Sequence, residues 1–486
     1  MAAMPFIDRH LERYVLAHAW TSGRSELVVV HGRRRVGKSE LLSRWAAYKP
    51  VAYFVAAQQL ERDQLADLGR VLGPLAVGFR RGRPPRLALG DWDGALDAVA
   101  AAADRRRVGL VLDEFPYLVD ANPALPSLVQ RWWDRSGSRA NLVLVLAGSQ
   151  QSMMRRLVSS DGALYGRPTR RIHLHPFDYF HAARFARRWA PEDRVRLYAV
   201  AGGIPDYLEE FDPARSMHDE LLRVAYQPDG RLFREAPDLL RSEFTEPRTY
   251  ETVLRAMANG ATTPGEIAAR AGLAGANRVN PYLERLIDLE LVERRVPPAE
   301  ASEARPRTSQ YVVADPYLRF YFALVDPWRS AIQAGQGARV LGELWGAAFD
   351  VHVSHVFEEV ARQHLRRLAG TGQILPLAQV GYWWFAGGDI DVAGTRGRHL
   401  VAAGSAKWTS DYMKPADLAD LRRDASLVAP DDDPGLLLYS RSGFDRNLSA
   451  GPRLRLVGLP DLFRAELEFE RAPPYPSPAS TSNRSR

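Results

Sequence analysis

Three apolar runs in the first third of the chain predict buried strands. They begin at Leu27, Val108 and Asn141, and each ends in glycine or in polar residues. A strand that is buried on both faces reads as a continuous apolar run, and such strands belong to parallel sheets covered by helices. Because the first run is followed by apolar residues at helical spacing, this part of the chain predicts an α/β fold with a parallel sheet.

The middle of the chain changes to helical spacing. Residues 177–246 predict a set of helices, interrupted at Gly202, Gly203 and several prolines, that we interpret as a helical lid over the sheet. Three further helices are predicted over residues 250–257, 264–271 and 279–289, followed by strands at 291–296 and 310–313. Three helices and a hairpin in this order are typical of a winged helix.

Local signals refine two of these helices. Thr262 and Thr263 are both candidate caps of the second helix, since a threonine side chain accepts a hydrogen bond from the exposed backbone N–H groups. Pro281 should limit how far the third helix extends toward its amino terminus, because proline cannot donate a backbone hydrogen bond. On this third helix, Arg278 and Arg285 are offset by acidic neighbours.

The last part of the chain begins near Leu341 with a helical stretch and continues with two strands joined by a turn at residues 395–398. Alternation along a strand places Asp389 and Asp391 on one face, and Ser405 and Lys407 likewise share a face. From residue 472 onward the chain is rich in Pro and Ser, and we expect a disordered tail there.

Composition excludes several classes of protein. The chain of 486 residues is long enough for roughly three domains. It has no cysteine, which excludes a disulfide framework, a thiolate metal site and a cysteine nucleophile. No run approaches the roughly 18 apolar residues of a membrane span, and residues 1–10 lack a signal pattern, so we expect a cytoplasmic protein with no membrane partner. The net charge of +7 favours a polyanionic partner or an anionic ligand.

The most specific motif is Gly-Arg-Arg-Arg-Val-Gly-Lys-Ser at residues 32–39, which follows the first predicted strand and opens a helix. In this setting the backbone N–H groups of the loop surround phosphate oxygens, and the helix adds its positive end. Lys38 would reach the β- and γ-phosphates, and Ser39 would bind Mg²⁺. The expected nucleotide contacts are Gly32, Arg33, Arg34, Arg35, Val36, Gly37, Lys38, Ser39 and Glu40.

The other two strands end in residues that suit hydrolysis. Asp113 would hold Mg²⁺ through water, and Glu114 would orient or deprotonate the attacking water. Ser149 follows the third strand, where its hydroxyl would lie beside the γ-phosphate. Parallel α/β sheets bring their ligand groups together at the carboxyl ends of the strands, so we expect these residues to converge with Lys38.

An ordered set of motifs resembles the archaeal-type ATPases, P-loop proteins of the AAA+ and STAND neighbourhood that carry an uncharacterised, nuclease-like carboxyl-terminal domain. The resemblance runs from Pro5 to about Ser440, and its motifs lie at residues 6–12, 32–39, 112–117, 164–167, 202–205 and 314–320. It implies ATP as the nucleotide, with Arg9 near the base, Arg167 contacting the γ-phosphate in cis or in a neighbouring subunit, and Pro205 in a lid that reads nucleotide state. No motif in the residues themselves distinguishes ATP from GTP.

The carboxyl-terminal hairpin resembles the core of restriction-endonuclease-like nucleases. The resemblance implies a metal at Asp391, a lysine at Lys407 that steadies hydroxide, and assistance from Glu358. The position of the second metal-binding carboxylate is Ser405, whose hydroxyl is a weak ligand for a hard cation, so we expect a degenerate site without nuclease activity. Asp389 could supply a carboxylate from a shifted position, and Lys407 could hold a phosphate without cleavage.

These observations predict domains at residues 1–176 (P-loop core), 177–246 (lid), 247–335 (winged helix), 341–465 (nuclease-like domain) and 472–486 (tail). We expect an ATP- and Mg²⁺-dependent switch that is coupled to the binding of nucleic acid, most readily DNA, through the winged helix and the inactive nuclease-like domain. Arg305 and Arg307 of the wing loop would contact phosphates. Packing of the third helix on the lid or on another protein is the competing interpretation. Two alternatives for the whole chain are an ATP-gated nuclease and a STAND-like scaffold that recruits protein partners. Besides nucleic acid, a homo-oligomer or a protein partner is compatible with the sequence.

Overall fold

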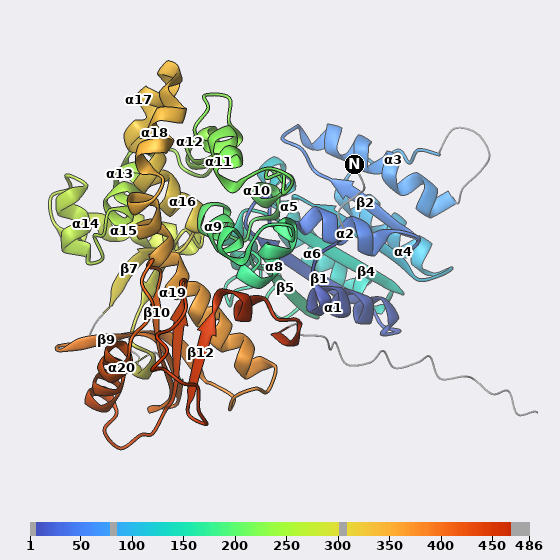
Figure 1. Ribbon diagram of the computed structural model, residues 1–486. Helices are drawn as coiled ribbons and strands as arrows, with labels where there is room; N and C mark the ends of the chain where they lie inside the picture. The colour runs from blue at the N-terminus through green and yellow to red at the C-terminus, as the bar shows by residue number, and fades with distance from the viewer. Residues whose placement is uncertain (1–5, 78–84, 301–308, 468–486) are drawn as a thin grey trace, which may run out of the picture. The chain divides into compact units, whose positions relative to one another are not determined.

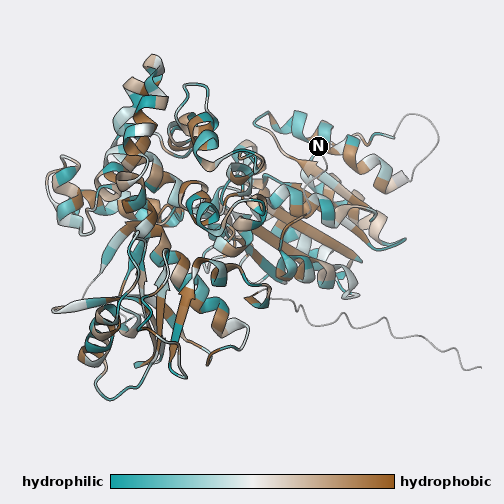
Figure 2. Cartoon of the chain, in the orientation of Figure 1, coloured by the Kyte–Doolittle hydropathy of each residue, from teal (hydrophilic) through white to brown (hydrophobic). Residues whose placement is uncertain are grey.

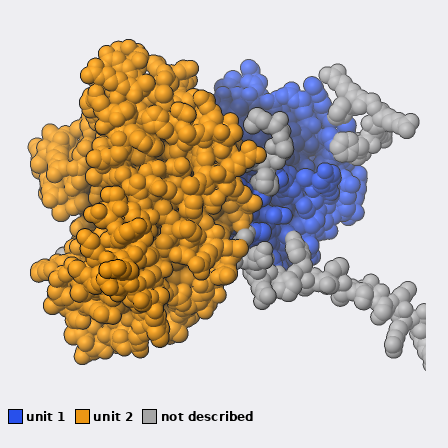
Figure 3. Space-filling model, in the orientation of Figure 1, with its two compact units in different colours: residues 1–175, 470–486 blue, residues 176–469 orange. Residues whose placement is uncertain are grey.

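The computed structural model describes residues 6–77, 85–300 and 309–467, which fall into two compact units. Unit 1 holds the residues up to His175, and unit 2 begins at Pro176 (Figure 3). Arg305, Arg307 and the predicted tail at 472–486 lie outside the described residues. No helix in the described ranges is long and apolar enough to cross a membrane.

Unit 1 is built on a sheet of five parallel strands. Their spatial order is β2 (Val51–Val55), β3 (Val108–Asp113), β4 (Leu142–Gly148), β1 (Glu26–Gly32) and β5 (Arg170–Leu174) (Figure 1). The three apolar runs form β1, β3 and β4, so the predicted parallel sheet is confirmed. Because β4 lies between β1 and β3, the carboxyl ends of all three strands meet at one edge.

Helices cover both faces of this sheet. On one face, Leu16 of α1 (His10–Thr21) and Leu41 of α2 (Lys38–Ala46) pack against Val28 and Val30. The other face packs against α3 (Glu61–Val77), α4 (Trp92–Ala103), α5 (Phe115–Ala121), α6 (Leu125–Arg135) and α7 (Gln151–Leu157). The central strands are buried on both faces and strongly apolar, as Figure 2 shows, which anchors the strand ends that carry the polar residues.

Unit 2 begins with helices, as the spacing predicts. These are α8 (Tyr179–Ala182), α9 (Pro191–Ala201), α10 (Pro205–Leu208), α11 (Met217–Ala225) and α12 (Arg231–Glu243). The next three are α13 (Pro247–Ala258), α14 (Pro264–Arg270) and α15 (Ala276–Asp288), followed by the antiparallel pair β6 (Val292–Arg295) and β7 (Gln310–Val313). Of the two candidate caps, Thr263 is the one that caps α14, in a reciprocal arrangement with Glu266.

The expectation that Pro281 limits the third helix is wrong. The helix α15 starts at Ala276 and holds Pro281 in its interior. A proline inside a helix removes the hydrogen bond that its own N–H would have donated, and its ring crowds the carbonyl four residues earlier. The apolar side chains of Val279, Leu283 and Leu286 are all buried, and their packing offsets that loss.

The carboxyl-terminal part of unit 2 is a mixed five-stranded sheet. Its order is β12 (Leu454–Gly458), β11 (Gly435–Ser440), β10 (His399–Lys407), β9 (Gly388–Arg396) and β8 (Gln379–Phe385). The predicted hairpin is β9 and β10, which pair antiparallel. The long helix α19 (Ala347–Gly370) contacts β9 through Arg362, which reaches Asp391, while α20 (Pro415–Val428) packs on Ile390, whose side chain lies on the other face of the strand. Figure 1 shows both helices beside this sheet.

Candidate functional site

The loop between β1 and α2 has the backbone geometry that phosphate binding requires. Gly32 leaves the strand so close to β5 that a Cβ atom there would lie 2.4 Å from the carbonyl oxygen of Leu174, so only glycine fits. Arg35 and Gly37 both have positive φ angles, of 66° and 93°. Such left-handed residues turn successive N–H groups inward, and they form concave sites for anions.

Lys38 lies inside this loop. Its side chain is buried, and its Nζ atom donates to the carbonyl oxygens of Gly32 and Arg33, both at 2.9 Å. The ammonium group is therefore held at the centre of the loop, where the charge of a phosphate would be attracted most strongly. The neighbouring loop residues differ in exposure: Arg33 and Val36 are buried, whereas Arg35, Ser39 and Glu40 are exposed.

Ser39, in the first turn of α2, contacts Asp113, the last residue of β3. The Oγ atom of Ser39 donates to Oδ2 of Asp113 at 2.6 Å, and the hydroxyl of Tyr53 donates to the same oxygen at 2.7 Å. The remaining oxygen of Asp113 accepts the backbone N–H of Glu114 at 3.0 Å. Burial and then the charge of Asp113 raise the pKa of Tyr53, so that its hydroxyl stays a proton donor.

Sequence reasoning missed Tyr53. It lies on β2, two residues before Val55, which pairs in register with Asp113. Strand alternation brings Tyr53 to the same face as Val55. The sequence signal for its role was a single hydroxyl-bearing residue in an otherwise apolar strand.

Glu114 leaves the sheet in a left-handed conformation, with φ 53° and ψ 44°. Its carboxylate accepts hydrogen bonds from the Oγ atom of Ser149, at 3.0 and 2.8 Å, and from the backbone N–H of Ser149 at 3.3 Å. Gly148 allows this contact, because a Cβ atom there would lie 2.6 Å from Pro116 at the start of α5. The structure therefore brings together Lys38 and Ser39 with the acidic residues and serine at the ends of β3 and β4.

Of the two arginines that the family resemblance indicates, one contacts the phosphate loop and the other does not. Arg9 is buried, and its Nη2 atom donates to the carbonyl oxygen of Val36 at 3.0 Å, so it braces the phosphate loop from the side of α1. Arg167 forms an ion pair with Asp134 of α6 at 3.0 Å and lies outside the cluster of strand-end residues. The hydrogen bonds that the Arg167 guanidinium donates to the Asp134 carboxylate raise the pKa of Arg167.

A second cluster lies in unit 2, on the α19 side of β9. Oδ2 of Asp391 accepts hydrogen bonds from Oγ of Ser405 at 3.2 Å and from the backbone N–H of Ala406 at 2.8 Å. Burial, followed by the charge of Asp391, raises the pKa of Glu358 to about 7. Burial and Asp389 raise the pKa of Asp391 as well. Crowded carboxylates of this kind attract a cation.

Two basic residues beside this cluster have acidic partners. Nζ of Lys407 is half-exposed and lies 3.7 Å from Asp417, not at Asp391. Arg362, which sequence reasoning missed, is buried and donates from Nη1 to the carbonyl oxygen of Asp391 at 2.8 Å and from Nε to Glu359 at 2.8 Å. Glu358 and Glu359 precede Arg362 by four and three residues, a spacing that places their side chains beside it on one face of a helix. This spacing is the sequence signal that indicates a role for Arg362.

The geometry at the ends of β1, β3 and β4 defines the first unit as a P-loop ATPase. A family model described as an ATPase domain predominantly from Archaea matches residues 6–211, and a model of archaeal and bacterial proteins of unknown function matches residues 321–418. An uncharacterised protein of Methanocaldococcus jannaschii is 30% identical over 434 residues, which cover 88% of this chain and 93% of that protein. The chain therefore belongs to the family of archaeal-type ATPases with this carboxyl-terminal domain, as the motifs indicate.

Solved structures are similar at lower identity. A Walker-type ATPase of Pyrococcus abyssi is 20% identical, with a TM-score of 0.48 over 65% of this chain and 96% of that one. The ORC2 protein of Aeropyrum pernix, in an ADPNP and ADP complex, is 15% identical, with a TM-score of 0.38 over 69% of this chain and 97% of that one.

Proposed function

We propose that this ATPase is a switch in which Mg²⁺-dependent ATP hydrolysis in unit 1 controls contact with nucleic acid through unit 2. The observation that carries the ATPase part is the hydrogen bond of 2.6 Å between Ser39 and Asp113, which joins the phosphate loop to the acidic strand end. A serine hydroxyl and a carboxylate beside bound phosphates are the groups that hold Mg²⁺ in this class of site. The ion, when bound, would neutralise charge that develops on the phosphates.

The roles of the other residues follow from their positions. Lys38 would bind the β- and γ-phosphates from the centre of the loop, where the N–H groups of residues 32–40 surround them. Glu114 would orient the attacking water or take its proton, and Ser149 would hold the Glu114 carboxylate in place. Arg9 would fix the loop beside the base through its contact with Val36.

Arg167 suits a role in a neighbouring subunit. Its pairing with Asp134 is partly exposed, so the guanidinium is accessible from outside unit 1. An arginine supplied in trans stabilises the charge of the phosphoryl transition state. This role needs a homo-oligomer that forms when ATP is bound.

Contact with DNA is supported by the exposed surface of α15. Asn277, Arg278 and Asn280 are all exposed at its amino-terminal end, whereas the acidic Glu284 comes a full turn later. Asparagine and arginine are side chains that read base edges, and the amino-terminal residues of a recognition helix contact bases in a winged-helix arrangement. The basic net charge of +7 agrees with a polyanionic partner.

We further propose that the nuclease-like part of unit 2 does not cleave. The hydroxyl of Ser405 donates a hydrogen bond to Oδ2 of Asp391, and the ammonium group of Lys407 pairs with Asp417. The ATP-gated nuclease is the alternative that plasmid cleavage by the native protein would favour. The STAND-like scaffold would instead bind ATP with little turnover and recruit a protein.

Steady-state hydrolysis by the full chain tests the proposal. Lys38→Ala should abolish ATP turnover, because the phosphates lose their central cation. Lys49→Ala, three residues beyond the end of α2, removes a lysine outside the loop and should leave turnover unchanged. Equal turnover in both variants would defeat the proposal.

A further inference from the structure

The lid helices α8 and α9 contact α19, the long helix of the carboxyl-terminal part of unit 2. The sequence predicts these elements as parts of two separate domains, at residues 177–246 and 341–465. In the structure they belong to one compact unit. Polar side chains join them at both ends of α19 and in between.

Arg367, in the last turn of α19, makes the most deeply buried of these contacts. Its side chain is 4% exposed. Nε donates to Oδ2 of Asp178, the cap of α8, at 2.6 Å, and Nη1 donates to the carbonyl oxygen of Leu467 at 2.8 Å. The guanidinium also lies 4.3 Å from the centre of the Phe180 ring. Because a guanidinium holds its donors in a rigid plane, Arg367 fixes the direction of α19 relative to the start of α8.

Gln363, one turn earlier, joins both lid helices to α19. Its side-chain oxygen accepts the backbone N–H of Tyr179 at 3.0 Å, and Nε2 donates to the hydroxyl of Tyr198 at 3.0 Å. The hydroxyl of Tyr179 in turn donates to the carbonyl oxygen of Leu462 at 2.9 Å. Both tyrosines are buried, so separation of the two parts would leave polar groups without partners away from water.

Ion pairs join the same elements at the amino-terminal end of α19. Arg441, which follows β11, pairs with Asp350 of α19 at 2.9 Å and with Glu192 of α9 at 2.8 Å. Asp350 also accepts the indole N–H of Trp408, the residue after β10, at 3.0 Å. Arg441 and Asp350 are partly buried, so salt screens their attraction less than that of a surface pair.

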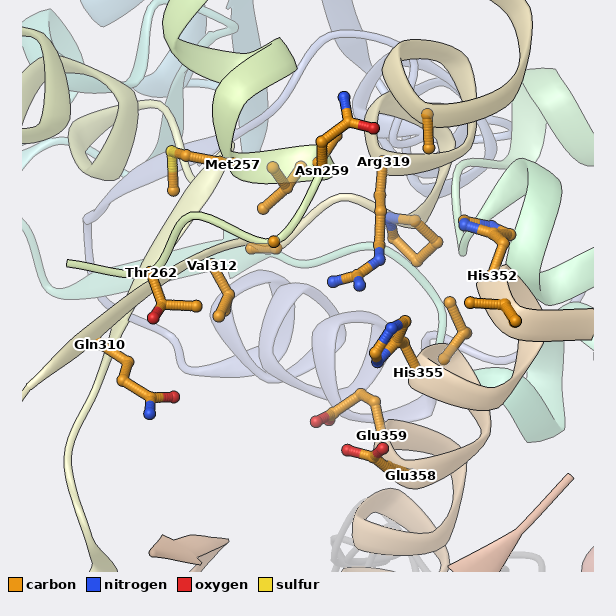
Figure 4. A pocket seen from close by; sticks show the side chains of 18 of the residues that line it. Met257, Asn259, Thr262, Gln310, Val312, Arg319, His352, His355, Glu358 and Glu359 are labelled. Carbon is orange, nitrogen blue, oxygen red and sulfur yellow. The ribbon is translucent and has the colours of Figure 1, made fainter. Parts of the chain in front are cut away.

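His352 shows that one helix serves both the lid and the second cluster. Nε2 of this buried side chain donates to the carbonyl oxygen of Ala199, in the last turn of α9, at 2.8 Å. Figure 4 shows His352 beside a cavity that α19 lines, with Glu358 farther along the same helix. Arg362 of this helix holds the backbone of Asp391 on β9. A displacement of α9 therefore carries the Glu358 cluster with it.

The Arg367 contact comes directly after unit 1 in the chain. Residues 175–177 alone separate Leu174, the last residue of β5, from Asp178. The strand β5 pairs with β1, and Leu174 lies in register with Gly32, where the phosphate loop begins. A change in the phosphate loop thus has a short covalent path to the residue that Arg367 holds.

We propose that the lid helices and the carboxyl-terminal sheet, residues 178–201 and 347–467, form one mechanical body that α19 holds together. Nucleotide state in unit 1 then displaces the Glu358 cluster together with the lid, through α19 and without a conformational change in the winged helix. Only this second step rests on the proposed ATP switch, because the contacts that form the body lie wholly in unit 2.

Amide hydrogen exchange of the full chain in rising urea, without nucleotide, tests the single body. Arg441→Gln removes the ion pairs to Asp350 and Glu192. It should lower the protection of α9 and α19 by the same factor, of at least threefold, while β1 and β3 keep theirs. Arg422→Gln, which changes an exposed arginine of α20, is the matched control and should alter none of them. If α9 keeps its protection in Arg441→Gln, or if β1 and β3 lose as much as α9, the inference is overturned.

Exchange with bound nucleotide tests the route through α19. In Glu114→Gln, ATP with Mg²⁺ should change the exchange of α9 and α19 at the same ATP concentration, relative to ADP. Arg367→Lys keeps the charge but loses the planar donors, and together with Arg441→Gln it should reduce the change in α19 at least threefold while α9 responds as before. Gln363→Ala takes the place of Arg367→Lys if that variant does not fold.

The two experiments separate this inference from the proposed function. An undiminished response of α19 in the combined variant would refute the route through α19. No response of α9 to ATP would instead defeat the proposed switch, and the urea experiment would still decide whether the lid helices and the sheet form one body.

Discussion

The hydroxyl of Ser149 bridges both oxygens of the Glu114 carboxylate, at 2.8 and 3.0 Å, across the ends of the neighbouring strands β4 and β3. The backbone N–H of Ser149 adds a third hydrogen bond at 3.3 Å. The residue proposed to activate water is therefore held by the residue proposed to lie beside the γ-phosphate. A change in what Ser149 contacts would also change the orientation of Glu114.

Ser149→Ala should lower ATP turnover by about tenfold while leaving ATP binding unchanged, because it removes the hydrogen bond that orients the general base. Turnover and calorimetric affinity are measured side by side. Ser127→Ala, at an exposed position on α6, is the matched control. A loss of ATP affinity without a loss of turnover would show that Ser149 acts on binding instead.

Tyr53→Phe should raise the Mg²⁺ concentration that gives half-maximal turnover by several-fold. The hydroxyl donates to Oδ2 of Asp113, the oxygen that Ser39 also contacts, so its removal leaves the carboxylate less firmly oriented. A Mg²⁺ titration of ATP hydrolysis measures the effect. An unchanged titration would mean that Ser39 and the backbone N–H of Glu114 suffice to place Asp113.

Glu358→Gln should be more stable than the native protein at high pH, and this advantage should shrink at low pH. The pKa of Glu358 is raised to about 7, so its favourable contribution is complete below the ordinary value of 4.5 and is lost as the pH rises through 7. The stability difference between variant and native protein should grow over this window by at most about 3.5 kcal/mol, because each pKa unit is worth about 1.4 kcal/mol.

Thermal unfolding of both proteins at several pH values measures that difference. The comparison must be made at each pH, because burial lowers the pKa values of His352 and His364 from 6.5 to about 3. These groups change stability with the opposite sign between about pH 3 and 6.5. A difference between the two proteins that is constant with pH would contradict the assigned environment of Glu358.

Arg278→Ala should weaken DNA binding and reduce its salt dependence by about one counterion, because the exposed side chain lies at the amino-terminal end of α15. Affinity for a labelled duplex is measured across a salt series. Arg422→Ala, on the exposed face of α20, serves as the control. Identical salt slopes for native protein and Arg278→Ala would favour a protein partner for α15.

The apolar runs and the phosphate-loop motif predict the sheet of unit 1 and the contact of Ser39 with Asp113. In a parallel sheet the carboxyl ends of the strands lie at one edge, so the polar residues that follow them come close together. Sequence reasoning cannot find Tyr53 or Arg362 in the same way. Their roles depend on which strands become neighbours and on which helix covers β9. The course of α15 past Pro281 was likewise decided by the burial of Leu283, a tertiary effect that outweighs one lost hydrogen bond.

The retention of ATP by Glu114→Gln tests the central claim most directly. The native full chain, mixed with Mg²⁺ and labelled ATP, should release ADP and phosphate with repeated turnover. Glu114→Gln should bind ATP with native affinity and keep it unhydrolysed, with turnover at least 100-fold lower, since the proposed base is replaced by a neutral amide of the same shape. Native turnover in Glu114→Gln, or no ATP binding by the native protein, would contradict the account.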